Sequence, residues 1–240
     1  MTSEHADSDI DDSRLLQHVG ESTWGPADVE SQCIVWELRP WQRAWKKAGL
    51  EQSLPVLEEF AAAVDRTGLT RRLVRGFGRD PERLLIAAMA WGFGTTGYGG
   101  FRTATMLGHR EAIEAIVATA HSASAEEAYR CLWDRNHAAV PYLGTAFGTK
   151  LLYFAGDRGA RRPRLLIYDA NVRLGLRATG QDFPPPSSLT TRRYIAYLEL
   201  VERVAKQAEV SPDVVEYTLF RIGKQERSPR RASGFKRDAR

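Results

Sequence analysis

Apolar and polar positions alternate with the period of an α-helix along most of the chain. Apolar residues recur at steps of three and four, and alternating runs of β-branched residues are few. Two segments carry helix-start signals, since Ser124 precedes Glu127 by three positions and Ser211 is followed by Pro212. The pattern predicts helices over residues 53–65, 81–92, 109–121, 124–136, 146–156, 170–178, 188–207 and 211–223.

The predicted fold class is therefore all-α, either as one globule or as two closely packed helical lobes. The segment Leu165–Tyr168 is the one plausible extended piece, and Gly94–Gly100 is predicted to be a glycine-rich loop. We expect three regions along the chain. Residues 1–30 are predicted to be an acidic, disordered tail, residues 31–226 a helical domain, and residues 227–240 a flexible basic tail that adds phosphate affinity.

The charge is distributed unevenly between the N-terminal region and the rest of the chain. The 240 residues include 34 basic and 30 acidic side chains. Residues 1–31 contain eight acidic side chains and a single base, Arg14, which leaves 33 basic against 22 acidic residues, or +11, in the remainder. A body with this excess of positive charge favours polyanionic partners such as nucleic acid.

Several classes of protein and site do not fit the sequence. Cys33 and Cys131 are far apart and form no CxxC pair, so neither a zinc site, an iron–sulfur cluster nor a disulfide framework is expected. The five histidines have no metal-ligand spacing, and no phosphate-binding glycine motif for a nucleotide cofactor is found. We therefore expect no metal and no cofactor. The chain has no long apolar span and no basic-then-apolar leader, so we expect it in the cytoplasm, associated with the nucleoid. We also expect it to be a monomer.

Lys150 and Asp169 are the candidate catalytic residues. Lys150 follows a glycine-spaced turn and precedes the apolar residues Leu151–Phe154, where a helix start and desolvation favour a neutral, nucleophilic amine. Asp169 stands 19 positions later, where an apolar run ends and a helical pattern begins, which predicts an N-cap. A lysine suited to imine chemistry together with an ionised carboxylate is the pair needed to break an N-glycosidic bond.

The residues around this pair resemble those of the helix-hairpin-helix DNA glycosylases, and among them the 8-oxoguanine glycosylase type. The resemblance covers roughly residues 138–180 and rests on Gly148-Thr149-Lys150, the 19-residue step, and Asp169-Ala170-Asn171-Val172-Arg173. It implies a two-lobed glycosylase fold with a helix-hairpin-helix motif. The chain departs from the family at Thr145-Ala146-Phe147-Gly148, where the family usually has Pro-Gly-Val-Gly.

The resemblance implies a DNA glycosylase with AP lyase activity that acts on double-stranded DNA containing a modified base. Lys150 would form the Schiff base and Asp169 would stabilise the developing sugar cation. The hairpin residues Gly144, Thr145, Gly148 and Thr149 are expected to bind a phosphate of the DNA backbone. Because the base must leave the duplex, an aromatic pocket is expected, with Trp91, Tyr98, Phe101 and Phe220 as candidates.

Two other interpretations of the sequence stay open. The chain could be a non-catalytic nucleic-acid-binding module that retains the hairpin, in which case borohydride would trap no covalent adduct. It could also be an imine-forming enzyme for small carbonyl compounds, although such lysines usually lie on barrel strands. The sequence does not fix the excised base. Oxidised guanine is the family default, and both DNA repair and defence against modified DNA are consistent with the pair.

Overall fold

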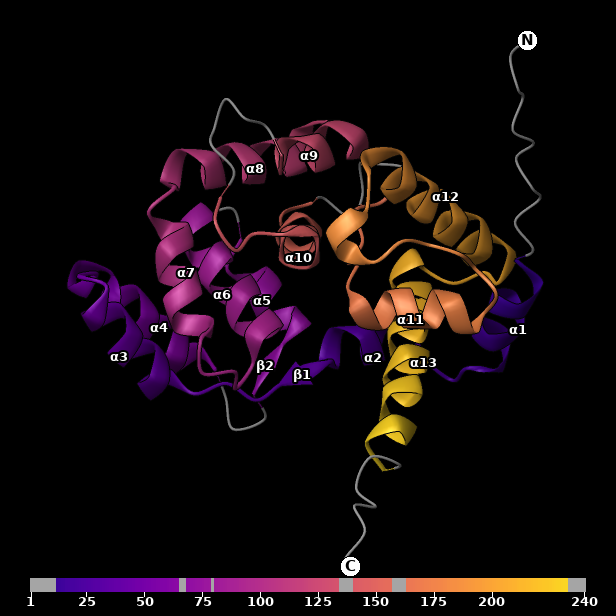
Figure 1. Ribbon diagram of the computed structural model, residues 1–240, viewed down its shortest axis with the longest axis horizontal. Helices are drawn as coiled ribbons and strands as arrows, with labels where there is room; N and C mark the ends of the chain where they lie inside the picture. Colours follow the sequence, from indigo (N-terminus) through magenta and orange to yellow (C-terminus); the bar gives the residue numbers. More distant parts are fainter. Residues whose placement is uncertain (1–11, 65–67, 79, 134–139, 157–162, 233–240) are drawn as a thin grey trace, which may run out of the picture.

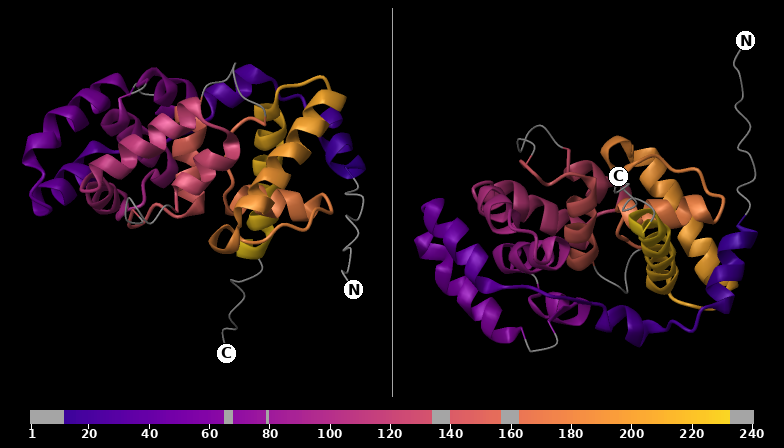
Figure 2. Two further views of the ribbon diagram at one scale, coloured as in Figure 1. Left: turned by 90° about the horizontal axis from the view of Figure 1, so that it is seen from above. Right: turned by 60° about the horizontal axis from the view of Figure 1, so that its bottom comes forward.

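The computed structural model describes residues 12–64, 68–78, 80–133, 140–156 and 163–232. They form two groups of helices, and α10 (Thr145–Ala155) lies between the groups (Figures 1 and 2). The predicted all-α fold class is confirmed, because the described residues form only one sheet, with two strands of two residues each. None of the described helices combines the length and apolar character needed to cross a bilayer.

The first group consists of the described residues between 33 and 131 and is built around α6 (Pro81–Phe93). Every residue of α6 from Leu84 to Trp91 is buried, as expected for a helix that is apolar on all sides. The short strands β1 (Cys33–Ile34) and β2 (Leu69–Thr70) pair antiparallel beside it. The remaining helices of this group are α3 (Leu38–Lys47), α4 (Leu54–Ala63), α5 (Arg71–Gly76), α7 (Gly99–Leu107), α8 (Arg110–Ser122) and α9 (Ala125–Cys131), with the 3-10 turn η1 (Glu51–Ser53) before α4.

The second group combines segments from both ends of the described chain. Its helices are α1 (Ser13–Glu21), α2 (Pro26–Ser31), α11 (Ala170–Ala178), α12 (Thr191–Gln207) and α13 (Pro212–Ala232), with the 3-10 turn η3 (Pro186–Ser188) before α12. The α11 and α13 backbones approach very closely. A Cβ on Gly175 would lie 2.0 Å from the Leu219 carbonyl oxygen, and one on Gly223 would lie 1.9 Å from that of Asn171. Glycine at both positions is therefore what allows this packing.

All eight predicted helices have counterparts, in α4, α6 and α8–α13. The pattern missed α1, α2, α3, α5 and α7. Two of these, α2 and α5, contain only six residues, and α7 begins with two glycines inside the expected loop. Leu165–Tyr168, expected to be extended, is neither helix nor strand, and all four of its residues are buried.

Two expected tails differ from the structure. The prediction of a disordered acidic segment over residues 1–30 is wrong for its described part, since α1 and α2 bury Leu15, Val19 and Val29 within the second group. The apolar residues are few, but they lie at helical spacing and face the core. The basic tail was expected from residue 227, whereas α13 continues to Ala232. Residues 1–11, 134–139 and 233–240 lie outside the described residues, and the helix-hairpin-helix motif stays a prediction.

Candidate active site

Lys150 lies in the second turn of α10, with its side chain directed toward α11. The residue is only 6% exposed. The helix begins at Thr145, one residue before the predicted start, and Gly144 is its N-cap, so Lys150 lies beyond the first turn. The influence of a helix dipole falls off within the first turn. Burial and neighbouring side chains, rather than the helix start, therefore set the environment of this amine.

Gly92 of α6 makes room for the aliphatic part of Lys150. A Cβ at Gly92 would lie 3.1 Å from Lys150 Cδ and 2.9 Å from the Phe147 ring. The Lys150 ammonium in turn lies 5.6 Å from the centre of that ring. Sequence reasoning missed Gly92, because a glycine near the end of a helix usually signals the helix terminus rather than space for a side chain from elsewhere.

Asp169 is the N-cap of α11, as predicted. Its Oδ1 accepts hydrogen bonds from the backbone N–H groups of Asn171 at 2.9 Å and Val172 at 3.1 Å. These bonds satisfy N–H groups that have no partner within the helix and fix the orientation of the carboxylate. The second oxygen, Oδ2, points toward α10.

Lys150 and Asp169 form a buried ion pair between the two helices. Lys150 Nζ donates to Asp169 Oδ2 at 3.0 Å and to the Ala146 carbonyl at 3.1 Å. The side chains are 7% and 14% exposed, respectively. Burial favours a higher pKa for Asp169, but the Lys150 charge and the N–H groups of Val172 and Asn171 outweigh it and hold the pKa below its ordinary value of 3.8. The carboxylate is therefore ionised at neutral pH.

Hydrogen bonds from buried side chains hold the segment that precedes Asp169. The Tyr194 hydroxyl donates to the Leu166 carbonyl at 2.8 Å, and the Tyr197 hydroxyl donates to the Ile167 carbonyl at 2.9 Å. These bonds replace the strand pairing that a buried extended segment otherwise needs. Two tyrosines of α12 thus fix the approach of the chain to the N-cap.

The four expected phosphate-binding residues have different environments in the structure. Gly144 is exposed at the start of α10, and a Cβ there would meet no atom within 4 Å. In contrast, Thr145 and Thr149 are 4% and 0% exposed, and a Cβ on Gly148 would lie 2.7 Å from the Leu132 side chain. Gly148 and Thr149 therefore face the protein interior, where their small size serves helix packing, and only Gly144 is an exposed candidate for a backbone contact.

The four aromatic candidates for a base pocket lie in three separate environments. Trp91 is 4% exposed and packs edge-on against Phe154 at a centroid distance of 5.6 Å. Phe220 is partly buried on α13 and stacks on Tyr217. Tyr98 and Phe101 are each 51% exposed, at and near the start of α7. The sequence pattern could not separate these cases, since each ring lies in a helical or glycine-rich context.

A buried network connects α10 to the helices around it. Arg71 forms an ion pair with Glu216 at 2.7 Å, and both side chains are fully buried. The same guanidinium donates to the Tyr153 hydroxyl at 3.0 Å and to Gln32 Oε1 at 2.7 Å. Since Tyr153 follows Lys150 by one helical turn, the network fixes α10 relative to α5 and α13.

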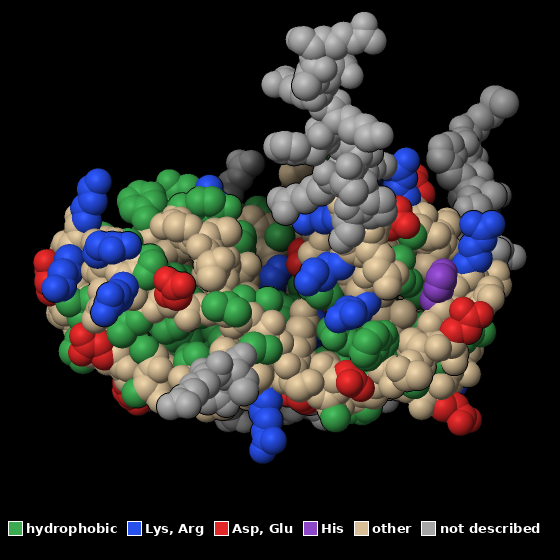
Figure 3. Space-filling view, turned by 90° about the horizontal axis from the view of Figure 1, so that it is seen from below, with side chains coloured by type: hydrophobic (Ala, Val, Ile, Leu, Met, Phe, Trp, Pro, Cys, Tyr) green, Lys and Arg blue, Asp and Glu red, His purple; other side chains and the backbone are tan. Residues whose placement is uncertain are grey.

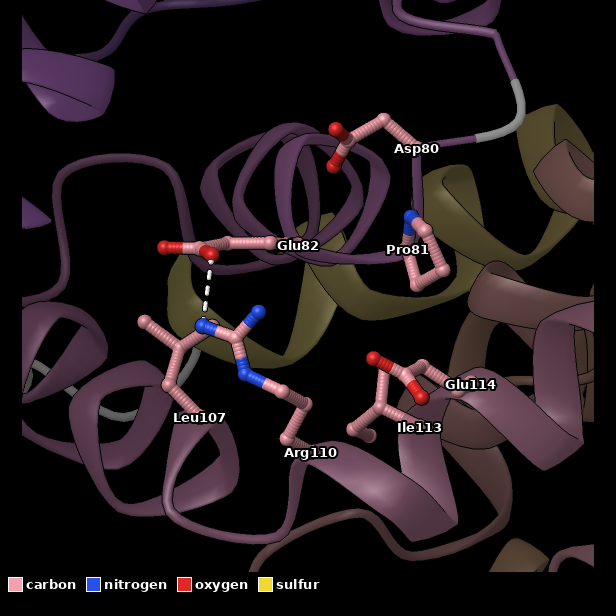
Figure 4. A pocket seen from close by; sticks show the side chains of 7 residues that line it. All are labelled: Asp80, Pro81, Glu82, Leu107, Arg110, Ile113 and Glu114. Carbon is pink, nitrogen blue, oxygen red and sulfur yellow. Dashed lines mark hydrogen bonds and ion pairs between the residues drawn. The ribbon is translucent and has the colours of Figure 1, made fainter.

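One surface pocket lies away from this pair. It is lined by residues from the start of α6 and from the α7–α8 junction: Asp80, Pro81, Glu82, Leu107, Arg110, Ile113 and Glu114 (Figure 4). Glu82 and Arg110 form an ion pair at 3.0 Å within it. Neither Lys150 nor Asp169 lines this pocket.

The described residues have the all-α fold class that the resemblance implied, and they bring Lys150 and Asp169 into contact. A family model described as "Putative 8-oxoguanine DNA glycosylase OGG-like protein" matches residues 27–220. Because the match covers most of the 240 residues, the chain belongs to this family of DNA glycosylases. No curated protein and no solved structure matches the chain.

Proposed function

We propose that this protein is a bifunctional DNA glycosylase and AP lyase that excises a modified base, with Lys150 as the nucleophile and Asp169 as its charged partner. The observation that carries the proposal is the 3.0 Å contact between Lys150 Nζ and Asp169 Oδ2, in a chain that belongs to an OGG-like family of DNA glycosylases. By the family default, the substrate is double-stranded DNA that contains an oxidised purine.

In the proposed reaction the Lys150 amine first loses a proton and then attacks C1′ of the damaged nucleotide. The bond between C1′ and the base breaks, and the base leaves with the bonding electron pair and takes up a proton. Opening of the sugar ring then gives an imine between Nζ and C1′. Removal of a proton from C2′ expels the phosphate on the 3′ side and nicks the strand.

Asp169 supports two parts of this scheme. Its lowered pKa keeps it ionised at neutral pH, so its negative charge can stabilise the positive charge that develops on the sugar as the base departs. It also contacts the amine directly, so it can pass the Nζ proton on to solvent before attack and regain its negative charge before the base departs. The two N–H bonds from α11 hold the carboxylate in this orientation without large reorganisation.

The test is borohydride trapping on duplex DNA that carries either an abasic site or a panel of modified bases. Wild-type protein is expected to form a covalent adduct, and Lys150→Gln to form none while remaining folded and still binding damaged duplex. Lys206→Gln, which removes an exposed lysine of α12, is the matched control and should trap as the wild type does. Absence of an adduct with the wild type would favour a non-catalytic DNA-binding module. Full trapping by Lys150→Gln would assign the nucleophile to another residue.

A further inference from the structure

Three exposed aromatic rings gather around one arginine near the start of α10. Tyr98, Phe101 and Tyr142 are 51%, 51% and 45% exposed. The Arg102 guanidinium lies 4.2 Å from the centre of the Tyr98 ring and 5.1 Å from that of Tyr142, and Phe101 contacts Tyr142 at a centroid distance of 6.1 Å. We call Tyr98, Phe101, Arg102 and Tyr142 the aromatic platform. So much exposed ring surface in one place indicates a binding function.

The platform is held in place and connected to the proposed reaction site. Tyr142 has a φ of 66°, an uncommon conformation for a tyrosine, which the surrounding structure must impose. Tyr98 packs edge-on against Phe93, which stacks on Phe147 at a centroid distance of 4.0 Å. Phe147 in turn lies beneath the Lys150 ammonium. A continuous series of ring contacts therefore leads from the platform to the lysine.

Positive charge lies on the exposed face of α3, the helix that packs against the start of α7. Arg39, Arg43, Lys46 and Lys47 are all exposed on this helix. α3 packs against the start of α7, since Trp45 Nε1 donates to the Gly100 carbonyl at 3.0 Å and a Cβ on Gly100 would lie 2.9 Å from Trp41 Cα. At the end of the molecule where Figure 1 places α3, Figure 3 shows Lys and Arg side chains beside a patch of hydrophobic ones.

We infer that the aromatic platform and the basic face of α3 together bind an unpaired DNA strand. Exposed rings interleaved with cations are the two elements of single-strand recognition, in which bases stack on the rings while the charges follow the phosphates. A base-paired duplex offers its bases only at the edges, so it cannot use three exposed rings in this way. This inference rests on the proposed function. It extends the substrate class of the Lys150 site to modified bases in single-stranded or locally melted DNA.

Affinity for a fluorescein-labelled oligothymidine, measured by anisotropy with the full chain, tests the binding directly. Tyr98→Ala, Phe101→Ala and Tyr142→Ala are each expected to weaken it by about tenfold, because each change removes one stacking surface. Trp133→Ala is the matched control, since Trp133 is also exposed (42%) but packs on Tyr129 outside the platform. In Arg43→Gln the slope of log affinity against log salt should fall by about 0.7, the value for one lost single-strand phosphate contact.

The substrate class is tested by trapping on the same abasic oligonucleotide in single-stranded and duplex form. The platform variants should lose adduct on the single strand and retain it on the duplex. The inference would be overturned if folded platform variants bound oligothymidine as tightly as the wild type, or if Trp133→Ala weakened binding equally. A loss of covalent adduct confined to the duplex would overturn it as well. Lys150→Gln should still bind oligothymidine, so failure of the proposed chemistry and failure of this inference give different results.

Discussion

The side chain of Thr149 and the backbone of Tyr168 form a hydrogen bond between the two parts of the site. The Thr149 hydroxyl accepts from the Tyr168 N–H at 3.0 Å and donates to the Thr145 carbonyl at 2.8 Å. Each of the two residues directly precedes one member of the ion pair, so this bond and the Lys150–Asp169 contact run side by side. Thr149, expected from the sequence to bind phosphate, thus holds the segments that carry the proposed catalytic pair.

The first prediction tests this positioning role. Thr149→Val keeps the shape of the side chain but leaves the buried Tyr168 N–H without an acceptor, at a cost of about 1–3 kcal/mol in the free energy of unfolding. Base release should also slow, because Asp169 is no longer fixed relative to Lys150. Thr218→Val removes a buried hydroxyl that bonds only the Val214 carbonyl of its own helix, and is expected to affect single-turnover rates little. Equal rates for Thr149→Val and the wild type would contradict the positioning role.

The second prediction separates the cap function of Asp169 from its charge. Asp169→Asn can still accept from the Asn171 and Val172 N–H groups, but it leaves the buried Lys150 ammonium without its ionic partner. We expect a loss of about 1–3 kcal/mol in stability, together with a drop in base release of orders of magnitude. Asp169→Ala should lose about 1 kcal/mol more, because the cap is removed as well. Normal turnover in folded Asp169→Asn would reduce Asp169 to a helix cap.

The third prediction concerns the pH dependence of stability. The Asp169 pKa is lowered in the folded state, so the ion pair stabilises the protein above the ordinary value of 3.8 and this stabilisation is lost as the pH falls through the folded-state pKa. The difference in unfolding free energy between the wild type and Asp169→Asn should therefore be constant from pH 7 to about pH 4. It should shrink at lower pH. Urea titrations at several pH values measure it, and a difference that closes above pH 5 would be inconsistent with a lowered pKa.

The fourth prediction tests the support that α13 gives to Asp169. Gly175→Ala places a Cβ 2.0 Å from the Leu219 carbonyl oxygen, so α11 must move away from α13. We expect a loss of more than about 2 kcal/mol in stability and slower base release, because α11 carries the N-cap carboxylate. Gly20→Ala is the matched control, as a Cβ on that helical glycine meets no atom within 4 Å. Gly175→Ala with wild-type melting temperature and rate would show that the packing is not needed.

Much of the helical architecture and the pair itself followed from the sequence alone. Helical periodicity predicted the long helices, because an amphipathic or wholly apolar helix encodes its burial locally. Asp169 was predicted as an N-cap from local chemistry, and the structure confirms it. In contrast, α1 and α2 were missed, because an acidic segment with few apolar residues becomes stably helical only when other helices bury Leu15, Val19 and Val29.

The environment of each side chain was decided only by the tertiary structure. Sequence spacing suggested that Lys150 and Asp169 act together, but their contact depends on the Thr149–Tyr168 bond, on Gly92 of α6 and on the glycine contacts between α11 and α13. The same holds for the aromatic residues, since Trp91 is buried while Tyr98 and Phe101 are exposed. Local sequence fixes where a helix starts and which of its faces is apolar. Which residues meet across helices depends on close packing between segments far apart in the chain, and this is decided only when the whole core forms.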